Sequence, residues 1–296
     1  MRSTVTSYKQ KGLFIMKKIG IVVVTYNRLE CLKQNIAALK ALKAPEDTQL
    51  SFYIIDNAST DGTPEWLKEN VPEGAKVVEM PENLGGSGGF STGVETAYED
   101  DMDFIWGMDD DAYPEPDALV AIFDLMKIKG EECCYWSNCN KDDYFKKGFR
   151  RVKQWMFVGF FVPRTVIDVI GFPRSDFFIF FDDAEYSDRI VDAGYRIYKV
   201  EKSVINHKDS YSDKKVGKFL GKDFDFPSYP DWKMYYYVRN FILRYKKSDR
   251  RYWERVLIKT PKLLVKLLLL SRSQVKIAAK AYWHGIIGKS GKQVSP

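Results

Sequence analysis

Histidine and cysteine are both scarce in this sequence of 296 residues. The histidines are His207 and His284, so any role that requires an imidazole has two candidates. The cysteines are Cys31, Cys133, Cys134 and Cys139. Their spacing fits neither a disulfide framework nor a zinc site built from paired C-x-x-C motifs. We therefore interpret all four as free thiols, which are typical of a reducing compartment.

Long hydrophobic runs are also missing. The longest, Leu263 to Leu270, has eight residues and includes Lys266, whereas about 20 apolar residues are needed to cross a bilayer. The N-terminal segment MRSTVTSYKQKGLFIMKK lacks the apolar core and the small-residue cleavage site of a secretory signal. We expect a cytoplasmic protein in which residues 1–17 are an N-terminal extension.

Positive charge is concentrated at the C-terminal end. The chain carries a net charge of +6, and residues 231–296 hold 16 Lys and Arg against three Asp and Glu, a net of +13 that leaves −7 for residues 1–230. An acidic body with a basic tail points to an anionic partner at the tail. Basic residues interleaved with Trp253, Leu263 and Trp283 are typical of a helix on anionic lipid.

We therefore expect residues 231–296 to contact the inner face of the plasma membrane. A solvated helix pair packed on the body is the alternative, and the same aromatic, basic region leaves a homo-oligomer open. Nucleic acid is not an expected partner, because the acidic body repels phosphate and the chain contains no known binding module.

Short apolar runs alternate with helical patterns over the first 130 residues. The periodicity predicts strands at 18–27, 51–56, 76–80 and 104–108, and helices at 29–42, after Thr63-Pro64, at 88–98 and from Pro116. Thr63 is expected to be the N-cap of its helix and Pro64 its first helical residue. This alternation predicts an α/β fold with a mostly parallel sheet.

Polar side chains follow each predicted strand. They are Thr25-Tyr26-Asn27-Arg28, Asp56-Asn57, Asn83 with its glycines, and Asp109-Asp110-Asp111. Ligands of parallel sheets bind beyond the carboxyl ends of the strands. Four such clusters in succession predict a crevice of nucleotide size.

The pattern changes after about residue 130. It predicts an aromatic-rich strand at 152–163, a strand at 177–181, a helix from 182 to about Ala193 closed by Gly194, strands at 195–200 and 203–207, a mobile loop at 209–230, and basic helices over 231–288. We place the catalytic domain at residues 18–230 and a helical basic region at 231–296.

The aspartate triplet predicts a metal site. Carboxylates two residues apart on an extended segment point the same way, and a divalent ion relieves their repulsion. His207 ends a short predicted strand and is the candidate third ligand beside Asp109 and Asp111. Carboxylates with a neutral imidazole suit Mn²⁺, and Mg²⁺ could substitute. A solvated acidic turn is the alternative.

The glycine-rich stretch from Asn83 to Phe90 does not match a dinucleotide fingerprint. GxGxxG would require glycine at Ser91, and the stretch follows the third strand rather than the first. What remains is a turn into a helix whose backbone amides can approach a phosphate. A plain tight turn is the alternative.

A second acidic cluster, Asp182-Asp183-Ala184-Glu185, lies where an apolar run meets a predicted helix. One of its carboxylates could act as a general base on an acceptor hydroxyl. Acidic residues also cap the N-termini of helices. Both roles fit if one aspartate caps and the other reacts.

Six motifs, in their order along the chain, resemble those of the inverting family-two glycosyltransferases of the GT-A fold. They are VVVTYNR (22–28), IIDNASTDGT (54–63), ENLGGSGGFSTG (82–93), WGMDDDAYPEPDAL (106–119), FFDDAEYSDRI (180–190) and INH (205–207). Within that family the chain looks most like bacterial galactofuranosyltransferases and the related rhamnosyltransferases of polysaccharide assembly. The resemblance implies a Rossmann-like central sheet flanked by helices.

The resemblance also implies roles for single residues. Thr25, Asn27, Arg28, Asp56 and Asn57 would hold the nucleoside and first phosphate, and Asn83, Gly86, Ser87, Gly88, Asp109 and Asp110 would lie at the donor. Asp109, Asp111 and His207 would bind the metal, and Asp183 would be the catalytic base. Some relatives have tryptophan where this chain has Phe181, which concerns the acceptor contact.

The sequence therefore predicts metal-dependent, inverting transfer of galactofuranose from a UDP-linked donor to a glycan or lipid-linked glycan. Rhamnose transfer from dTDP-rhamnose is the alternative within the family. A non-catalytic nucleotide-sugar-binding subunit is the alternative from another class. A nucleotidyltransferase would need a basic triphosphate-binding loop after the first strand, where only Arg28 is available.

Overall fold

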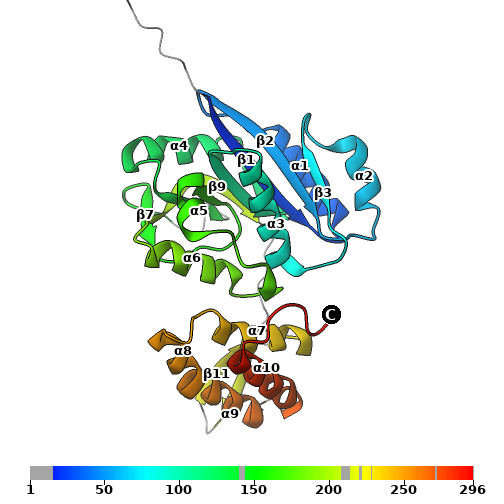
Figure 1. Ribbon diagram of the computed structural model, residues 1–296, viewed down its shortest axis with the longest axis vertical. Helices are drawn as coiled ribbons and strands as arrows, with labels where there is room; N and C mark the ends of the chain where they lie inside the picture. Colours follow the sequence, from blue (N-terminus) through cyan, green and yellow to red (C-terminus); the bar gives the residue numbers. More distant parts are fainter. Residues whose placement is uncertain are drawn as a thin grey trace, which may run out of the picture.

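The computed structural model of the protein describes residues 16–139, 144–207, 214–219, 222–227, 229–270 and 272–295. Its central feature is a nine-stranded sheet (Figure 1). The strands are β1 (Lys17–Thr25), β2 (Thr48–Asp56), β3 (Lys76–Glu79), β4 (Phe104–Asp109), β5 (Ala112–Pro114), β6 (Cys134–Cys139), β7 (Phe149–Val152), β8 (Phe160–Pro163) and β9 (Ile197–His207). Their order is β3-β2-β1-β4-β8-β6-β9-β5, and β7 pairs with β9.

The first half of the sheet is parallel and the second half is mixed. Strands β3, β2, β1 and β4 pair in parallel, as the alternation of strands and helices predicts. Strand β8 then pairs antiparallel with both β4 and β6. In the described part of the chain no helix lies between β6 and β8, so this connection lacks the helical crossover that usually joins parallel neighbours.

Helices cover both faces of the sheet. They are α1 (Leu29–Lys40), α2 (Thr63–Asn70), α3 (Gly85–Glu99), α4 (Ala118–Lys129), α5 (Arg164–Ile170) and α6 (Asp182–Asp192). One hydrophobic core joins β1 to α1 and α4, and the other joins it to α3, α5 and α6. Because β1 is buried on both faces, it reads as a continuous apolar run.

The C-terminal region is helical, as the sequence predicts. Its helices are α7 (Asp231–Leu243), α8 (Arg250–Glu254), α9 (Thr260–Leu270) and α10 (Val275–Ile287), and a single π turn (Arg255–Lys259) joins α8 to α9. Figure 1 shows them gathered below the α/β body. They share a core of their own in which α7 packs against α10.

Three predicted segments differ from the structure. Residues 177–181 were expected to be a strand, but they follow a 3₁₀ turn (Ser175–Phe177) as an irregular loop. Within 152–163 only the two ends are strands, Val152 in β7 and 160–163 in β8. Residues 214–219 and 222–227 form an antiparallel hairpin, β10 (Lys214–Phe219) with β11 (Lys222–Pro227), where a loop was predicted. The rest of the predicted 209–230 loop, apart from Tyr229 and Pro230, lies outside the described residues.

Smaller differences concern where elements begin and end. The two strands predicted at 195–200 and 203–207 are one strand, β9, which carries an irregularity opposite Ser137 and Asn138. Helix α3 begins at Gly85 rather than Gly88. Thr63 is the first residue of α2 rather than its N-cap, because Asp61 Oδ1 accepts hydrogen bonds from the Thr63 amide and hydroxyl.

Candidate active site

The aspartate triplet is attached to the end of β1. Asp109 ends β4, where it is paired with Val24 in the parallel ladder. The Thr25 hydroxyl donates to Asp110 Oδ2 over 2.7 Å, and this bond is buried. The first and the last of the four predicted strand-end clusters therefore meet at one edge of the sheet.

Arg28 offsets part of the negative charge of the triplet. Its Nη2 lies 2.6 Å from Asp111 Oδ2 and its Nη1 lies 3.3 Å from Asp110 Oδ1. Both carboxylates are buried, whereas the guanidinium is half exposed. Burial alone would raise the pKa of Asp111, but hydrogen bonds from His207 and Arg28 bring it below its ordinary value.

His207 reaches the triplet from the far end of β9. Strand β5 pairs antiparallel with β9, and this register sets Ala112 opposite His207. As a result, His207 Nε2 lies 3.2 Å from Asp111 Oδ1. The hydrogen bond that His207 donates to the Asp111 carboxylate raises the pKa of His207.

Asp109, Asp111 and His207 together fit a divalent cation. One ligand atom from each lies within 4.8 Å of the others. Burial, followed by the charges of Asp111 and Asp110, raises the pKa of Asp109 to about 7. A bound cation would remove this repulsion, and oxygen ligands with one imidazole suit such an ion. The three residues that the sequence groups as metal ligands are thus brought together.

A cavity of about 710 Å³ opens beside this cluster. Of the residues predicted to bind the donor, the metal or the acceptor hydroxyl, its walls include Thr25, Arg28, Asn57, Asn83, Gly86, Asp109, Asp110, Asp183 and His207. Residues from the four strand-end clusters and from the second acidic cluster therefore face one space.

The amide of Asn57 organises the glycine-rich segment at the cavity wall. Its Nδ2 donates to Asn83 Oδ1 (3.1 Å) and to the Gly85 carbonyl (2.9 Å), and its Oδ1 accepts from the Leu84 amide (2.9 Å). Gly85 has φ +73°, and a Cβ there would overlap the Phe178 carbonyl oxygen. Only glycine fits such a position, so the start of α3 is locked against the 177–181 loop.

Five predicted site residues are not among those that line the cavity. Asn27 Oδ1 accepts from the Thr60 amide, and Asp56 Oδ1 accepts from the Ser59 amide. Ser87 is fully buried, and a Cβ on Gly88 would overlap Leu84. Asp111 contacts Arg28 and His207. Asn27 and Asp56 therefore brace the loop around Ser59 and Thr60, and their part in donor binding stays a prediction, as do the roles of the other three.

Asp183 lines the cavity from the first turn of α6. Its Oδ1 accepts from the Ala184 amide over 2.6 Å. Burial raises the pKa of Asp183 to about 6, against the opposing effects of that amide and of the Arg244 charge. Burial and the charge of Asp183 raise the pKa of Asp182 to about 8. The two neighbouring carboxyls thus differ in pKa, and Asp183 ionises at the lower pH of the two.

The glycosyl transferase family 2 profile matches residues 20–185, more than half of the chain. This chain belongs to glycosyl transferase family 2. The matched stretch contains the aspartate triplet and Asp183, while His207 lies beyond it. No curated protein matches the sequence.

Solved glycosyltransferases share the fold. The mannosyltransferase PcManGT from Pyrobaculum calidifontis, in complex with GDP-Man and Mn²⁺, has a TM-score of 0.57 at 16% identity, covering 92% of this chain and 87% of that one. S. aureus TarS 1-349 in complex with UDP-GlcNAc has a TM-score of 0.54 at 13% identity, covering 91% and 81%. In the longer TarS structure the match covers 86% of this chain but only 44% of that chain, with a TM-score of 0.53 at 12% identity. The GT-A fold and the glycosyltransferase assignment expected from the sequence are confirmed.

In this family 2 glycosyltransferase, α7 holds the loop that precedes Asp183. Asn240 Nδ2 lies within hydrogen-bonding distance of the carbonyls of Phe177 (2.8 Å), Ile179 (2.8 Å) and Phe180 (3.1 Å). Arg239 Nη2 donates to the Phe177 carbonyl over 2.9 Å. Both side chains are fully buried, so these donors are satisfied by the loop.

The loop has an unusual backbone. Phe178, Phe180 and Phe181 all have positive φ, between +66° and +69°. Left-handed conformations cost a bulky residue of the order of 1–2 kcal/mol each. Their rings pack on aromatic rings of the C-terminal region, Phe178 on Tyr236 and Phe181 on Tyr237. The contacts from α7 maintain a backbone that the loop would not adopt by itself.

The sequence did not predict several residues that line the cavity. They are Tyr26, Phe90, Met156, Phe157, Phe178, Ile179, Phe180, Trp232 and Lys233. Tyr26 lies within a strand-end cluster, so its position could have been inferred. The aromatic segments were interpreted as strands, and the first turn of α7 was assigned to the membrane-facing tail. No local pattern signals that these segments meet.

A second cavity of about 400 Å³ lies on the other side of Asp183. It shares Met156, Phe180, Phe181 and Asp183 with the first. Trp136, Trp155, Tyr237 and Arg244 complete most of its wall. Trp155 Nε1 and Arg244 Nη2 are buried donors without a hydrogen-bond partner. Aromatic faces and unpaired donors beside a carboxyl suit a hydroxylated ligand.

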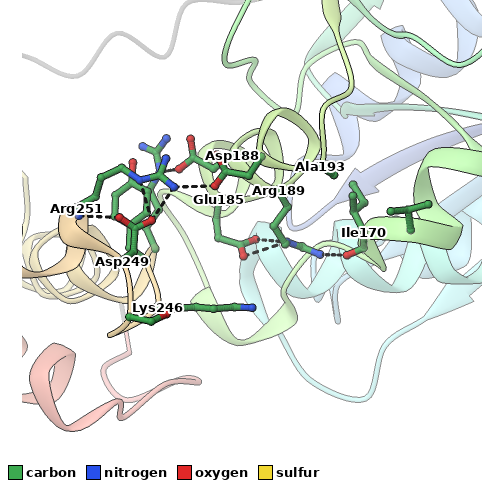
Figure 2. A pocket seen from close by; sticks show the side chains of 13 residues that line it. Ile170, Glu185, Asp188, Arg189, Ala193, Lys246, Asp249 and Arg251 are labelled. Atoms are coloured by element: carbon green, nitrogen blue, oxygen red, sulfur yellow. Dashed lines mark hydrogen bonds and ion pairs between the residues drawn. The ribbon is translucent and has the colours of Figure 1, made fainter.

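A third cavity, also about 400 Å³, separates α6 from the turn between α7 and α8 (Figure 2). Most of its charged side chains form ion pairs: Arg189 with Glu185, Arg244 with Asp188, and Arg251 with Asp192 and Asp249. The pairs of Arg244 and Arg251 join the C-terminal region to α6. Because most of these charges are paired, we assign this cavity a structural role.

Proposed function

We propose that this glycosyltransferase moves galactofuranose from UDP-galactofuranose to a glycan or lipid-linked glycan acceptor in cell-surface polysaccharide synthesis. The transfer is inverting and depends on a divalent metal ion. The observation that carries the proposal is that a cluster able to hold a divalent cation, Asp109, Asp111 and His207, borders the cavity of a family 2 domain into which the Asp183 carboxyl also faces.

The metal end of the cavity binds the diphosphate of the donor. Asp109, Asp111 and His207 would hold Mn²⁺, or Mg²⁺ in its place. Such an ion neutralises the charge that develops on the departing diphosphate. The Mn²⁺ and GDP-Man in the PcManGT structure, and the UDP-GlcNAc in TarS, support a nucleotide diphosphate donor with a divalent ion.

The nucleoside end lies beyond β1 and β2. Thr25, Asn27, Arg28, Asp56 and Asn57 hold the nucleoside and first phosphate. The start of α3, with Asn83, Gly86, Ser87 and Gly88, lies at the donor together with Asp110. A Cβ on Gly86 would meet no atom within 4 Å, which leaves the backbone of that turn open to a phosphate.

Asp183 is the base that accepts the proton of the acceptor hydroxyl. Its raised pKa of about 6 leaves it mostly ionised at neutral pH and closer to the operating pH of a proton acceptor. The second cavity, beyond Asp183, then receives the acceptor. The proposed transfer needs only one base. A glycosidase, by contrast, would need two carboxyl groups around a glycosidic bond.

The cellular location of the enzyme is a further part of this proposal. We propose that the enzyme works at the inner face of the plasma membrane, with residues 18–230 as the catalytic domain and 231–296 in contact with lipid. Four free cysteines, three of them buried, support a reducing compartment.

A thermal-shift screen with and without Mn²⁺ tests this function. The donors are UDP-galactofuranose, UDP-galactopyranose, UDP-glucose and dTDP-rhamnose. A ligand that binds the native state raises the melting temperature by mass action. We expect a manganese-dependent shift with UDP-galactofuranose, and Asp111→Asn should abolish the manganese dependence.

Other outcomes select the alternatives. A shift with dTDP-rhamnose alone would identify a rhamnosyltransferase. Donor binding without donor hydrolysis or transfer, in folded protein, would indicate a non-catalytic binding subunit. No shift with any donor would contradict the assignment of the metal triad.

A further inference from the structure

Exposed apolar side chains gather on the C-terminal helices. Among the described residues, 14 large hydrophobic side chains are exposed, and eight of them lie between residues 253 and 287. Those eight are between 48% and 67% exposed. Single exposed apolar residues are normal, but a contiguous patch marks an interaction surface.

The continuous helix from α8 through α9 is apolar on two sides. One side carries Val256 and Leu267, which are buried in the C-terminal cores. The opposite side is exposed, and its members fall within one broad stripe when the wider winding of the π turn at Arg255–Lys259 is counted. They are Trp253, Leu257, Ile258, Val265, Leu268 and Leu269.

Helix α10 repeats this arrangement. Ala278, Ala281 and Gly285 are buried, and the first two pack in the core that contains α7. Trp283 and Ile287 are exposed on the opposite side of the helix. Because both helices bury their inner sides against the α7 core, their exposed stripes face away from the catalytic body. We call these two stripes the outer face.

Basic residues border the outer face. Lys262 and Lys266 are exposed at the edge of the α9 stripe, and Lys276 and Lys280 share the side of α10 that carries Trp283 and Ile287. The acidic residues of this region are all engaged: Asp249 pairs with Arg251, Glu254 with Lys259, and Asp231 lies 3.4 Å from Gln274 Nε2. The outer face is therefore positive as well as apolar.

We propose that the outer face is the surface through which residues 231–296 make the lipid contact of the proposed function, on which this inference rests, and that it docks on an anionic lipid bilayer. Apolar side chains enter the boundary between headgroups and acyl chains, and the bordering lysines meet lipid phosphates. Tryptophan is favoured at that depth, and Trp253 and Trp283 both lie on the face. No helix of the described chain is long and apolar enough to cross a bilayer.

Sedimentation of the full chain with lipid vesicles tests the proposal. One vesicle population contains phosphatidylcholine alone, and the other also contains phosphatidylglycerol. We expect binding to the anionic vesicles, and weaker binding to the neutral ones. The triple variant Trp253→Ser/Leu257→Ser/Leu268→Ser should bind anionic vesicles about tenfold to a hundredfold less tightly.

Two further variants separate the contributions. Lys276→Gln/Lys280→Gln should weaken binding to anionic vesicles roughly tenfold and leave neutral vesicles unaffected. The matched control Ile128→Ser/Tyr144→Ser/Val169→Ser removes equally exposed apolar residues from the α/β body and should bind like the unmodified chain. All variants should keep the donor-induced thermal shift, so loss of lipid binding is distinct from failure of the proposed function.

Several results would overturn the proposal. They are no binding of the unmodified chain to either vesicle population, and equal loss of binding in the control variant. A third is a dimer, measured by light scattering, that the triple variant dissociates while vesicle binding is absent; the outer face would then be an interface between two copies of this chain.

Discussion

The metal end and the base end of the cavity are assembled in different ways. At the metal end, Asp109, Asp111 and His207 sit at or next to the ends of β4, β5 and β9, and the strand register sets their separation. At the base end, Asp183 follows a loop whose backbone is held by Asn240, 57 residues later in the chain. The first arrangement follows from sheet geometry, and the second depends on the docking of α7.

The forces at the two ends also differ. The metal end concentrates carboxylates that repel one another, with Arg28 as the partner that offsets them. The base end instead has an unfavourable backbone, with three phenylalanines at positive φ. A divalent cation would stabilise the first, whereas buried hydrogen bonds stabilise the second. Substitutions can therefore disturb one end and leave the other intact.

The largest effect is expected from Asp183→Asn. Loss of a general base lowers the transfer rate by roughly 10²–10⁴-fold, and the metal triad is untouched. The manganese-dependent thermal shift with donor should therefore stay while transfer is lost. Asp182→Asn is the control, because the pKa of about 8 at Asp182 keeps that carboxyl mostly protonated at pH 7. Intact transfer in Asp183→Asn would contradict the assignment of the base.

The second-largest effect is expected from Asn240→Ala. The variant removes the Asn240 donor from the Ile179 and Phe180 carbonyls, while the Phe177 carbonyl keeps its bond from Arg239, and this loss destabilises the fold by about 1–3 kcal/mol. The loop then positions Asp183 less well, and kcat should fall roughly tenfold to a hundredfold. Urea denaturation and steady-state kinetics measure both effects.

Tyr235→Phe is the matched control for Asn240→Ala. Tyr235 lies on α7, as Asn240 does, and the substitution removes its hydrogen bond with His284 of α10 without touching the loop. It should lower stability and leave kcat unchanged. Equal effects of both variants on kcat would show that α7 supports the site only through general stability.

Arg28→Gln should change the response to the metal ion and leave the base end intact. Its ion pairs are half exposed, so their loss should lower stability by only about 1 kcal/mol. The carboxylates would then repel one another more strongly, and Mn²⁺ by itself should raise the melting temperature more than in the unmodified chain. Lys33→Gln, which removes an exposed pair with Glu30, should change neither quantity. A smaller manganese shift in Arg28→Gln would mean that Arg28 helps to shape the site.

The smallest effect is expected from Arg244→Gln, read from the pH dependence of kcat. The Arg244 charge lowers the pKa of Asp183. Its removal should therefore move the midpoint of the acid limb of the kcat profile from near pH 6 to about half a pH unit higher. Arg244→Lys keeps the charge and should keep the limb. An unchanged profile in Arg244→Gln would show that another group sets it.

The raised pKa of Asp183 also makes the stability of the fold depend on pH. The folded-state pKa of Asp183, about 6, lies above that of an ordinary aspartate. The folded protein therefore holds this proton more tightly, so the group stabilises the fold fully at low pH. That contribution is lost as the pH rises through 6.

The metal end could be predicted from local sequence. Apolar strands followed by Thr25, Asp56 and Asp109 identify the carboxyl edge of a parallel sheet, where side chains far apart in the chain must meet. The assignment of His207 followed from the scarcity of histidine and from its position at a strand end. Both inferences depend on one short-range rule, the alternation of strand and helix.

The backbone conformation at the base end depends on the tertiary structure. The apolar run FFIFF predicts a buried strand, but Asn240 and Arg239 occupy the positions where strand neighbours would donate hydrogen bonds. Trp232 and Lys233 reach the cavity only because α7 returns to this loop. Hydrophobic periodicity predicts which residues are buried, whereas the partner that satisfies a loop's carbonyls is set by packing between distant segments.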